Sequence, residues 1–154
     1  MSFFHGVTTT SVDTGARTIT LPSSSIIGLC DTFTPGILGG GTAKAGELKL
    51  ITTKREAMAA FGAGAAITKA CQAIYAKAKA VIVAIGVAKL EDPALQTSAI
   101  IGGVLASGQR TGLQALLDGK SLFNAQPRLL IAPGHSATQA VATAMDSLAQ
   151  KLRA

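Results

Sequence analysis

The stretch AVIVAIGV at residues 80–87 decides the fold of this chain. It is apolar along its whole length and shows no alternation of apolar and polar side chains. A strand that is covered on both faces has this composition, because neither set of its side chains meets water. These residues therefore predict a central strand with protein layers on both sides of the sheet.

Three further segments extend the expected sheet. The segment SSSIIGLCDTF at residues 23–33 is a short apolar run, and LKLI at residues 48–51 has the length of a short strand. The segment RLLIA at residues 128–132 leads into the turn Pro133-Gly134-His135. Each has the composition of a strand bounded by turn residues.

Helical patterns fill the gaps between these strands. We expect helices over residues 54–61, 65–79, 94–107 and 136–154, and a short helical turn over residues 111–117 that Asp118-Gly119 closes. Thr53 and Glu56 have the spacing of a capping box, and Gly62 follows the first helix. The alternation of strands and helices predicts an α/β fold with a partial, largely parallel sheet.

Apolar stripes and one further N-cap residue support the prediction of these helices. The helix over residues 65–79 carries the stripe Ile67, Ala70, Cys71 and Ile74. Ser136 is expected to cap the last helix, because a serine hydroxyl can accept a hydrogen bond from a free amide of the first turn. The apolar face of that helix is formed by Ala140, Val141, Ala144, Met145, Leu148 and Leu152.

Residues 1–20 differ from the rest of the chain and are rich in threonine and serine. The segment VTTTSV at residues 7–12 favours extended backbone but has little to pack against. Its backbone groups could pair with its own domain or with the sheet of a neighbour, or the segment could be a frayed tail. We therefore divide the chain into an extended arm at 1–20 and an α/β domain at 21–154.

The composition indicates which kinds of partner to expect for the chain. The net charge of +6 and a pI near 9.7 favour an acidic partner. The basic residues are dispersed and lack interleaved aromatics, so we expect an acidic protein surface and no nucleic acid. Cys30 and Cys71 lie in apolar runs and predict buried free thiols. The longest apolar stretch, residues 80–88, is too short to insert across a membrane.

No group of residues has the spacing of a catalytic, metal or cofactor site, so we predict none of the three. The glycine-rich loop at residues 35–42 lacks the Gly-Lys-Ser/Thr ending of a phosphate loop. The turn at Gly134-His135-Ser136 lacks the last glycine of a nucleophile elbow. A small nucleotide- or anion-binding α/β module, using the loops at residues 36–42 and 133–136, is the alternative function.

Several separated segments resemble contractile tail sheath proteins, in particular those of R-type pyocins and related contractile-tail bacteriophages. They agree in order along essentially the whole chain. The segments are MSFFHGV at 1–7, GARTI at 15–19, IIGL at 26–29, RTGLQALL at 110–117, PRLLIAPG at 127–134 and QKLRA at 150–154.

The resemblance implies a structural subunit, not an enzyme. Such subunits form six-membered rings, stacked helically around an inner tail tube in a phage or pyocin particle that is assembled in the bacterial cytoplasm. Contraction drives the tube through a bacterial envelope, while extended arms complete the sheets of neighbours. Family members are much longer, so the domain is expected to be incomplete at its C-terminal end. The arm residues expected between subunits are Phe3, Phe4, Val7, Thr8, Thr9, Thr10, Ser11 and Val12.

The register of the arm stays open. Either Val7, Thr9 and Ser11 or the alternate set Thr8, Thr10 and Val12 would face the partner sheet, because successive side chains of a strand point to opposite faces. The segment is too polar on both faces for its sequence to select one set.

Overall fold

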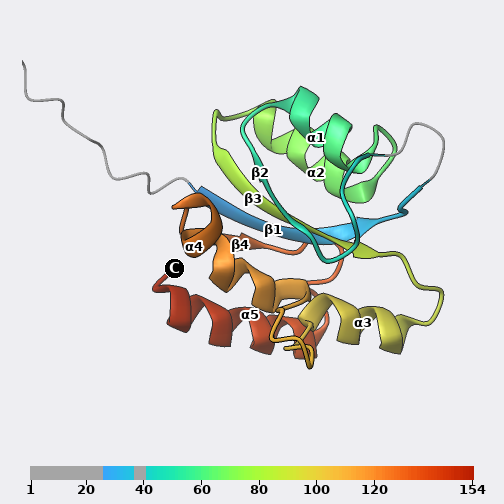
Figure 1. Cartoon of the computed structure of the whole chain (residues 1–154), viewed down its shortest axis with the longest axis vertical. Coiled ribbons are helices and arrows are strands. Elements are labelled where there is room, and N and C mark those ends of the chain that lie inside the picture. The colour runs from blue at the N-terminus through green and yellow to red at the C-terminus, as the bar shows by residue number, and fades with distance from the viewer. Residues whose placement is uncertain (1–25, 37–40) are drawn as a thin grey trace, which may run out of the picture.

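The computed structural model describes residues 26–36 and 41–154 (Figure 1). The arm predicted for residues 1–20, with all of its expected inter-subunit residues, lies outside the described residues. So do residues 23–25 of the first predicted strand.

A four-stranded sheet in the order β2-β3-β1-β4 organises the molecule (Figure 1). Strand β1 pairs in parallel with both β3 and β4, and β2 runs antiparallel to β3. The prediction of an α/β fold with a largely parallel sheet is therefore confirmed. The strands are β1 (Ile26–Phe33), β2 (Leu48–Ile51), β3 (Val81–Ala88) and β4 (Leu129–Ile131).

Helices cover both faces of this sheet (Figure 1). One layer consists of α1 (Lys54–Phe61) and α2 (Ala66–Tyr75). The opposite layer consists of α3 (Pro93–Ile101), the 3-10 helix η1 (Gly112–Asp118), α4 (Gly119–Phe123) and α5 (Gln139–Leu152).

The side chains of β3 supply both halves of the core. Ile82 and Ala84 pack with the α1/α2 layer, whereas Val83 and Ile85 pack with the α5 layer. All four side chains are fully buried. The uninterrupted apolar pattern of this strand thus reflects burial on both faces, as predicted.

Helix α1 begins and ends at the predicted residues. The Thr53 hydroxyl accepts a hydrogen bond from the Glu56 amide at 3.3 Å, and Gly62 follows the last turn. The Glu56 carboxylate accepts from the amide of Thr52 at 2.8 Å, one residue before the position that a capping box would use. These bonds lower the pKa of Glu56.

Two predicted helices end earlier than expected. Helix α2 ends at Tyr75, not at residue 79. The helix predicted for residues 94–107 was extended too far, because α3 ends at Ile101. Gly102 adopts a φ of +69° there, and a bridge between Val104 and Arg110 then closes a short hairpin. Left-handed backbone is accessible to glycine and stops the helix.

The predicted turn at Asp118-Gly119 is wrong, because η1 passes directly into α4 at these residues. The predicted cap at Ser136 is also wrong. Its amide donates to the Ala132 carbonyl at 3.0 Å, and α5 begins only after Thr138.

Helix α5 differs from its prediction at one further side chain. Ala140 is exposed, although Val141, Leu148 and Leu152 are buried as expected. The helix ends at Leu152, and Arg153 follows it in a left-handed conformation.

The close contact at Gly86 offers a test of the packing around β3. A Cβ atom at this position would lie 2.6 Å from the Phe33 ring and 2.9 Å from the Phe61 ring. We expect Gly86→Ala to lower the free energy of unfolding by about 1–3 kcal/mol, the usual cost of overpacking. Urea denaturation measures the effect.

Gly64→Ala is the matched control for this substitution, because a Cβ atom there would meet no atom within 4 Å. Equal stabilities of the two variants would contradict the packing described for Gly86.

Candidate assembly interface

The sheet has two edges that could accept another chain. Within residues 26–36 and 41–154, β2 pairs only with β3, and β4 pairs only with β1. The outer side of an edge strand presents unpaired N–H and C=O groups, which form a template for strand addition. The two edges are therefore the first candidates for self-assembly.

The hydrogen-bonding pattern of β4 shows which of its amides face the outer edge of the sheet. The Arg128 amide donates to the Ile26 carbonyl at 2.8 Å, so this residue faces β1. Successive residues of a strand direct their amides to opposite sides, so the amides of Leu129 and Ile131 face the outer edge. The Leu129 side chain is 53% exposed. This edge thus offers two backbone donors beside an exposed apolar side chain.

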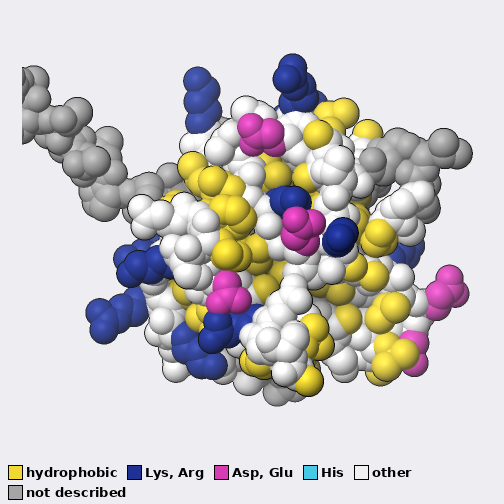
Figure 2. Space-filling model, in the orientation of Figure 1, with side chains coloured by type: hydrophobic (Ala, Val, Ile, Leu, Met, Phe, Trp, Pro, Cys, Tyr) yellow, Lys and Arg dark blue, Asp and Glu magenta, His cyan; other side chains and the backbone are white. Residues whose placement is uncertain are grey.

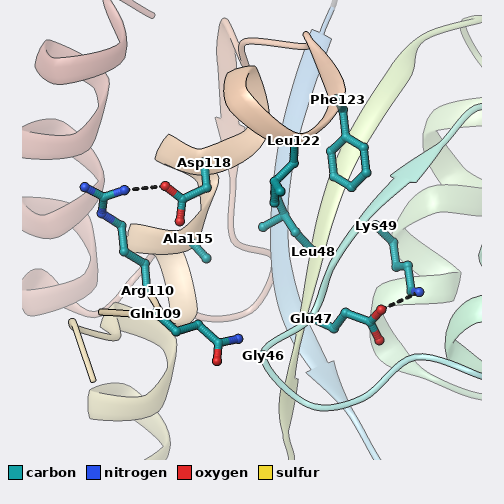
Figure 3. A pocket seen from close by; sticks show the side chains of 10 residues that line it. All are labelled: Gly46, Glu47, Leu48, Lys49, Gln109, Arg110, Ala115, Asp118, Leu122 and Phe123. Atoms are coloured by element: carbon teal, nitrogen blue, oxygen red, sulfur yellow. Dashed lines mark hydrogen bonds and ion pairs between the residues drawn. The ribbon is translucent and has the colours of Figure 1, made fainter. Parts of the chain in front are cut away.

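A groove of about 400 Å³ lies near the opposite edge of the sheet from β4, where β2 approaches η1 and α4 (Figure 3). Its charged side chains are paired within the chain. Lys49 contacts Glu47 at 2.6 Å, and Arg110 pairs with Asp118. The lining residues are Gly46, Glu47, Leu48, Lys49, Gln109, Arg110, Ala115, Asp118, Leu122 and Phe123.

The groove combines an apolar wall with charged borders. Figure 2 shows hydrophobic side chains gathered where α4 faces β2, with acidic and basic side chains around them. Leu122 in this wall is 63% exposed. Because the charged groups already pair with one another, the groove suits an apolar polypeptide segment better than a free anion.

Asp31 and His135 form a pair that we did not predict. The sequence predicts a turn at His135 and assigns no role to Asp31. The structure brings them together at the carboxyl ends of β1 and β4, with His135 Nε2 3.7 Å from Asp31 Oδ1. The carboxylate is buried and accepts a hydrogen bond from the Thr32 amide at 2.7 Å.

Burial raises the pKa of Asp31, against the opposing effects of the Thr32 amide and of His135. A signal for the pair was present in the sequence, since an acid closes the apolar run of β1 and a histidine follows β4. Parallel strands end at the same edge of a sheet, so residues after two neighbouring strands meet there. The order of the strands was needed to apply that rule.

Both cysteines lie buried in the core around this part of the sheet. Cys30 lies on the opposite face of β1 and contacts the Ile100 carbonyl at 3.9 Å. Burial raises the pKa of the Cys30 thiol to about 12 and that of Cys71 to about 11. Burial thus disfavours the thiolate, which is the reactive form of a cysteine. Both thiols are free and buried, as predicted.

The described residues also lack the other kinds of site. No three histidine, cysteine or acidic side chains in this part of the chain come together in a way that could hold a metal ion. Every helix from α1 to α5 is too short or too polar to cross a lipid bilayer.

The described part of the glycine-rich loop does not support the nucleotide- or anion-binding alternative. The amides of Thr42 and Ala43 donate to carbonyls at the end of α1, at 3.0 and 2.9 Å. They are therefore not free to bind phosphate. The Ser136 amide in the second loop is likewise bonded, to Ala132. Residues 37–40 of the first loop lie outside the described residues.

Among the residues that the structure describes, the fold is that of an α/β protein whose doubly covered sheet ends at two edge strands, β2 and β4. No protein-family model matches the chain. Over its full length it is 68% identical to a prophage major tail sheath protein of Pseudomonas aeruginosa (strain UCBPP-PA14). Over 99% of its length it is 34% identical to the tail sheath protein of Escherichia phage P2.

A third relative matches a shorter region. The tail sheath protein of Burkholderia phage BcepMu is 39% identical over 64 residues, or 41% of this chain. The chain belongs to the tail sheath proteins and corresponds to their amino-terminal portion. It spans 39% of the length of the Pseudomonas and P2 relatives.

The buried Asp31 carboxylate predicts a pH dependence of stability. Its pKa in the folded state lies above the ordinary value of 3.8. The stability that it contributes is therefore fully present below pH 3.8 and is lost as the pH rises through the raised value. Asp31→Asn keeps an acceptor for the Thr32 amide but carries no charge. We expect it to raise the thermal midpoint at pH 7 and to have little effect at pH 3.

Asp146→Asn provides the comparison, because Asp146 is an exposed acid on α5. The groups that act on the Asp31 carboxyl are Thr32 and His135, and both are unchanged in the two variants. A lower midpoint for Asp31→Asn at pH 7 would show that the ionised carboxylate stabilises the fold.

Proposed function

We propose that this chain is a structural subunit of a contractile tail sheath, which polymerises around an inner tube and contracts to drive that tube through a bacterial envelope. The observation that supports this function is the match, along the whole chain, to proteins named as tail sheath proteins. The subunit would be assembled in the bacterial cytoplasm and act in a phage or pyocin tail particle, as one member of six-membered rings stacked helically.

Strand addition by the arm is the proposed link between subunits. Residues 7–12 favour extended backbone but carry too few apolar side chains to form a core of their own. Pairing with the sheet of a neighbour would satisfy their N–H and C=O groups. A strand held by several backbone hydrogen bonds stays attached to the neighbouring sheet, so such a link would persist while the sheath changes length.

The edge of β2 is our proposed receiving site for the arm. Residues Glu47, Leu48 and Lys49 at this edge line the groove described above. An added strand would therefore gain backbone pairing on one side and the apolar wall at Leu122 on the other. Phe3 and Phe4 of the arm are the side chains best suited to cover that wall.

Electrostatic attraction is the proposed second contribution to assembly. The chain carries a net charge of +6, and Lys54, Arg55 and Lys69 on the α1/α2 layer are exposed. Figure 2 shows basic side chains projecting from several parts of the outline. An acidic surface on the inner tube or on a neighbouring subunit would be attracted to this layer.

Deletion of residues 1–20 tests the arm. We expect the intact chain to sediment as assemblies and the deletion variant to sediment as a monomer. The far-UV circular dichroism and the thermal midpoint should remain those of the α/β domain, because the described core contains none of the deleted residues. Analytical ultracentrifugation measures the difference.

A substitution gives the sharper version of this experiment. Thr8→Pro combined with Thr9→Pro removes one amide donor from each side of the predicted strand, so it blocks pairing in either register. Ala16→Pro with Arg17→Pro is the matched control, in the arm but beyond residues 7–12. Assemblies that form normally with the first pair of prolines would refute strand addition by the arm.

Salt tests the electrostatic contribution. The screening length falls from about 10 Å at 0.1 M salt to about 3 Å at 1 M. We therefore expect association of the chain with isolated tail tubes, measured by cosedimentation, to weaken as NaCl is raised across this range. Cosedimentation that does not change with salt would exclude a charge-driven contact.

A further inference from the structure

We propose that the open edge of β4 receives a fifth strand, parallel to β4, supplied by the polypeptide that follows the matched portion in the longer tail sheath proteins. This inference rests on membership of the family and on the connectivity of the sheet. It does not depend on contraction or on the arm.

One crossover of the sheet sets the direction expected for the next. The chain passes from β3 to the parallel strand β4, across β1, through α3, η1 and α4 on one face. Crossovers between parallel strands are right-handed in nearly all proteins. The connection from β1 to β3 is of another kind, because it includes the antiparallel strand β2.

Helix α5 indicates where the next crossover leads. Val141 and Leu148 of this helix pack with Ile100 of α3 and Leu116 of η1, so α5 lies in the same layer as the β3-to-β4 crossover (Figure 1). A crossover on this layer that keeps the same hand continues in the same direction, from β3 past β4. The next parallel strand therefore belongs outside β4, and not at the β2 edge.

The end of α5 lies where a parallel strand would have to begin. The Gln126 side chain donates to the Leu152 carbonyl at 2.6 Å, and the Arg128 guanidinium donates to the Arg153 carbonyl at 2.7 Å. These bonds hold the last turn of α5 beside the residues that lead into β4. A chain that leaves α5 there starts at the same end of the sheet as β4, which is the condition for parallel pairing.

The outer edge of β4 is suited to this occupant. Its outward amides, at Leu129 and Ile131, have no ladder partner among the described strands. Leu129 is in register with Ile27. The Ile27 side chain packs in the α1/α2 layer, whereas the Leu129 side chain is 53% exposed. The α1/α2 layer thus covers part of Ile131 but leaves Leu129 exposed, and an incoming strand with its own cover would bury this side chain.

A fusion protein tests the inference. This chain, made without residues 1–20 so that the arm cannot occupy the edge, is joined to the portion of the Pseudomonas aeruginosa relative that follows the matched region. Hydrogen exchange is followed by mass spectrometry in peptides that cover β4 and β2. We expect two amides in the β4 peptide to exchange at least about 10-fold more slowly in the fusion than in the unfused chain, with no change in β2.

A matched pair of substitutions supplies a second measurement. Leu129→Lys and Leu95→Lys replace leucines of similar exposure, 53% and 58%, on different elements. We expect Leu129→Lys to lower the thermal midpoint of the fusion more than that of the unfused chain, because only the fusion buries this side chain. Leu95→Lys should have the same effect on both.

Three results would overturn the inference. Unchanged exchange in β4, protection at β2 instead, or equal effects of Leu129→Lys on the two proteins would each show that the following polypeptide does not add to β4. A β4 edge that becomes protected only in the unfused chain with its arm intact would identify the arm of a second copy as the occupant. That last outcome would support strand addition by the arm but would move its receiving site from β2 to β4.

Discussion

Burial of β3 on both faces is the constraint on which the rest of the structure depends. Its side chains divide between two core clusters, so removal of either helical layer would expose half of the strand. The packing around β3 is close as well as apolar. Gly86 lies under the Phe33 and Phe61 rings, which meet edge to face at a centroid distance of 5.4 Å. A larger residue there would separate a helix from the sheet.

The periphery of the sheet follows from this central packing. A strand buried on both faces can extend its hydrogen bonding only sideways, and within the described residues the sheet ends at β2 and β4. Both edges have features suited to a polypeptide partner, an amphipathic groove at β2 and outward amides beside Leu129 at β4. The proposed function therefore uses the parts of the sheet that the domain itself leaves unpaired.

The sequence predicted those features that depend on neighbouring residues. Strand β2 and helix α1 were placed correctly because Thr53 and Gly62 mark the helix ends locally. The end of α3 was missed because Gly102 packs against the Thr111 backbone, a contact set by tertiary structure. The Asp31–His135 pair depends on strand order in the same way. The arm at residues 1–20 is a prediction that the structure does not address.

The central claim is that the arm finds its hydrogen-bond partners on another subunit. Solid-state NMR of assemblies that contain a mixture of 15N-labelled and 13C-labelled subunits tests it most directly, because 15N–13C contacts then arise only between molecules. The account predicts intermolecular contacts between residues 7–12 and an edge strand of the sheet. Contacts of these residues with their own subunit alone, in samples that carry both labels, would contradict it.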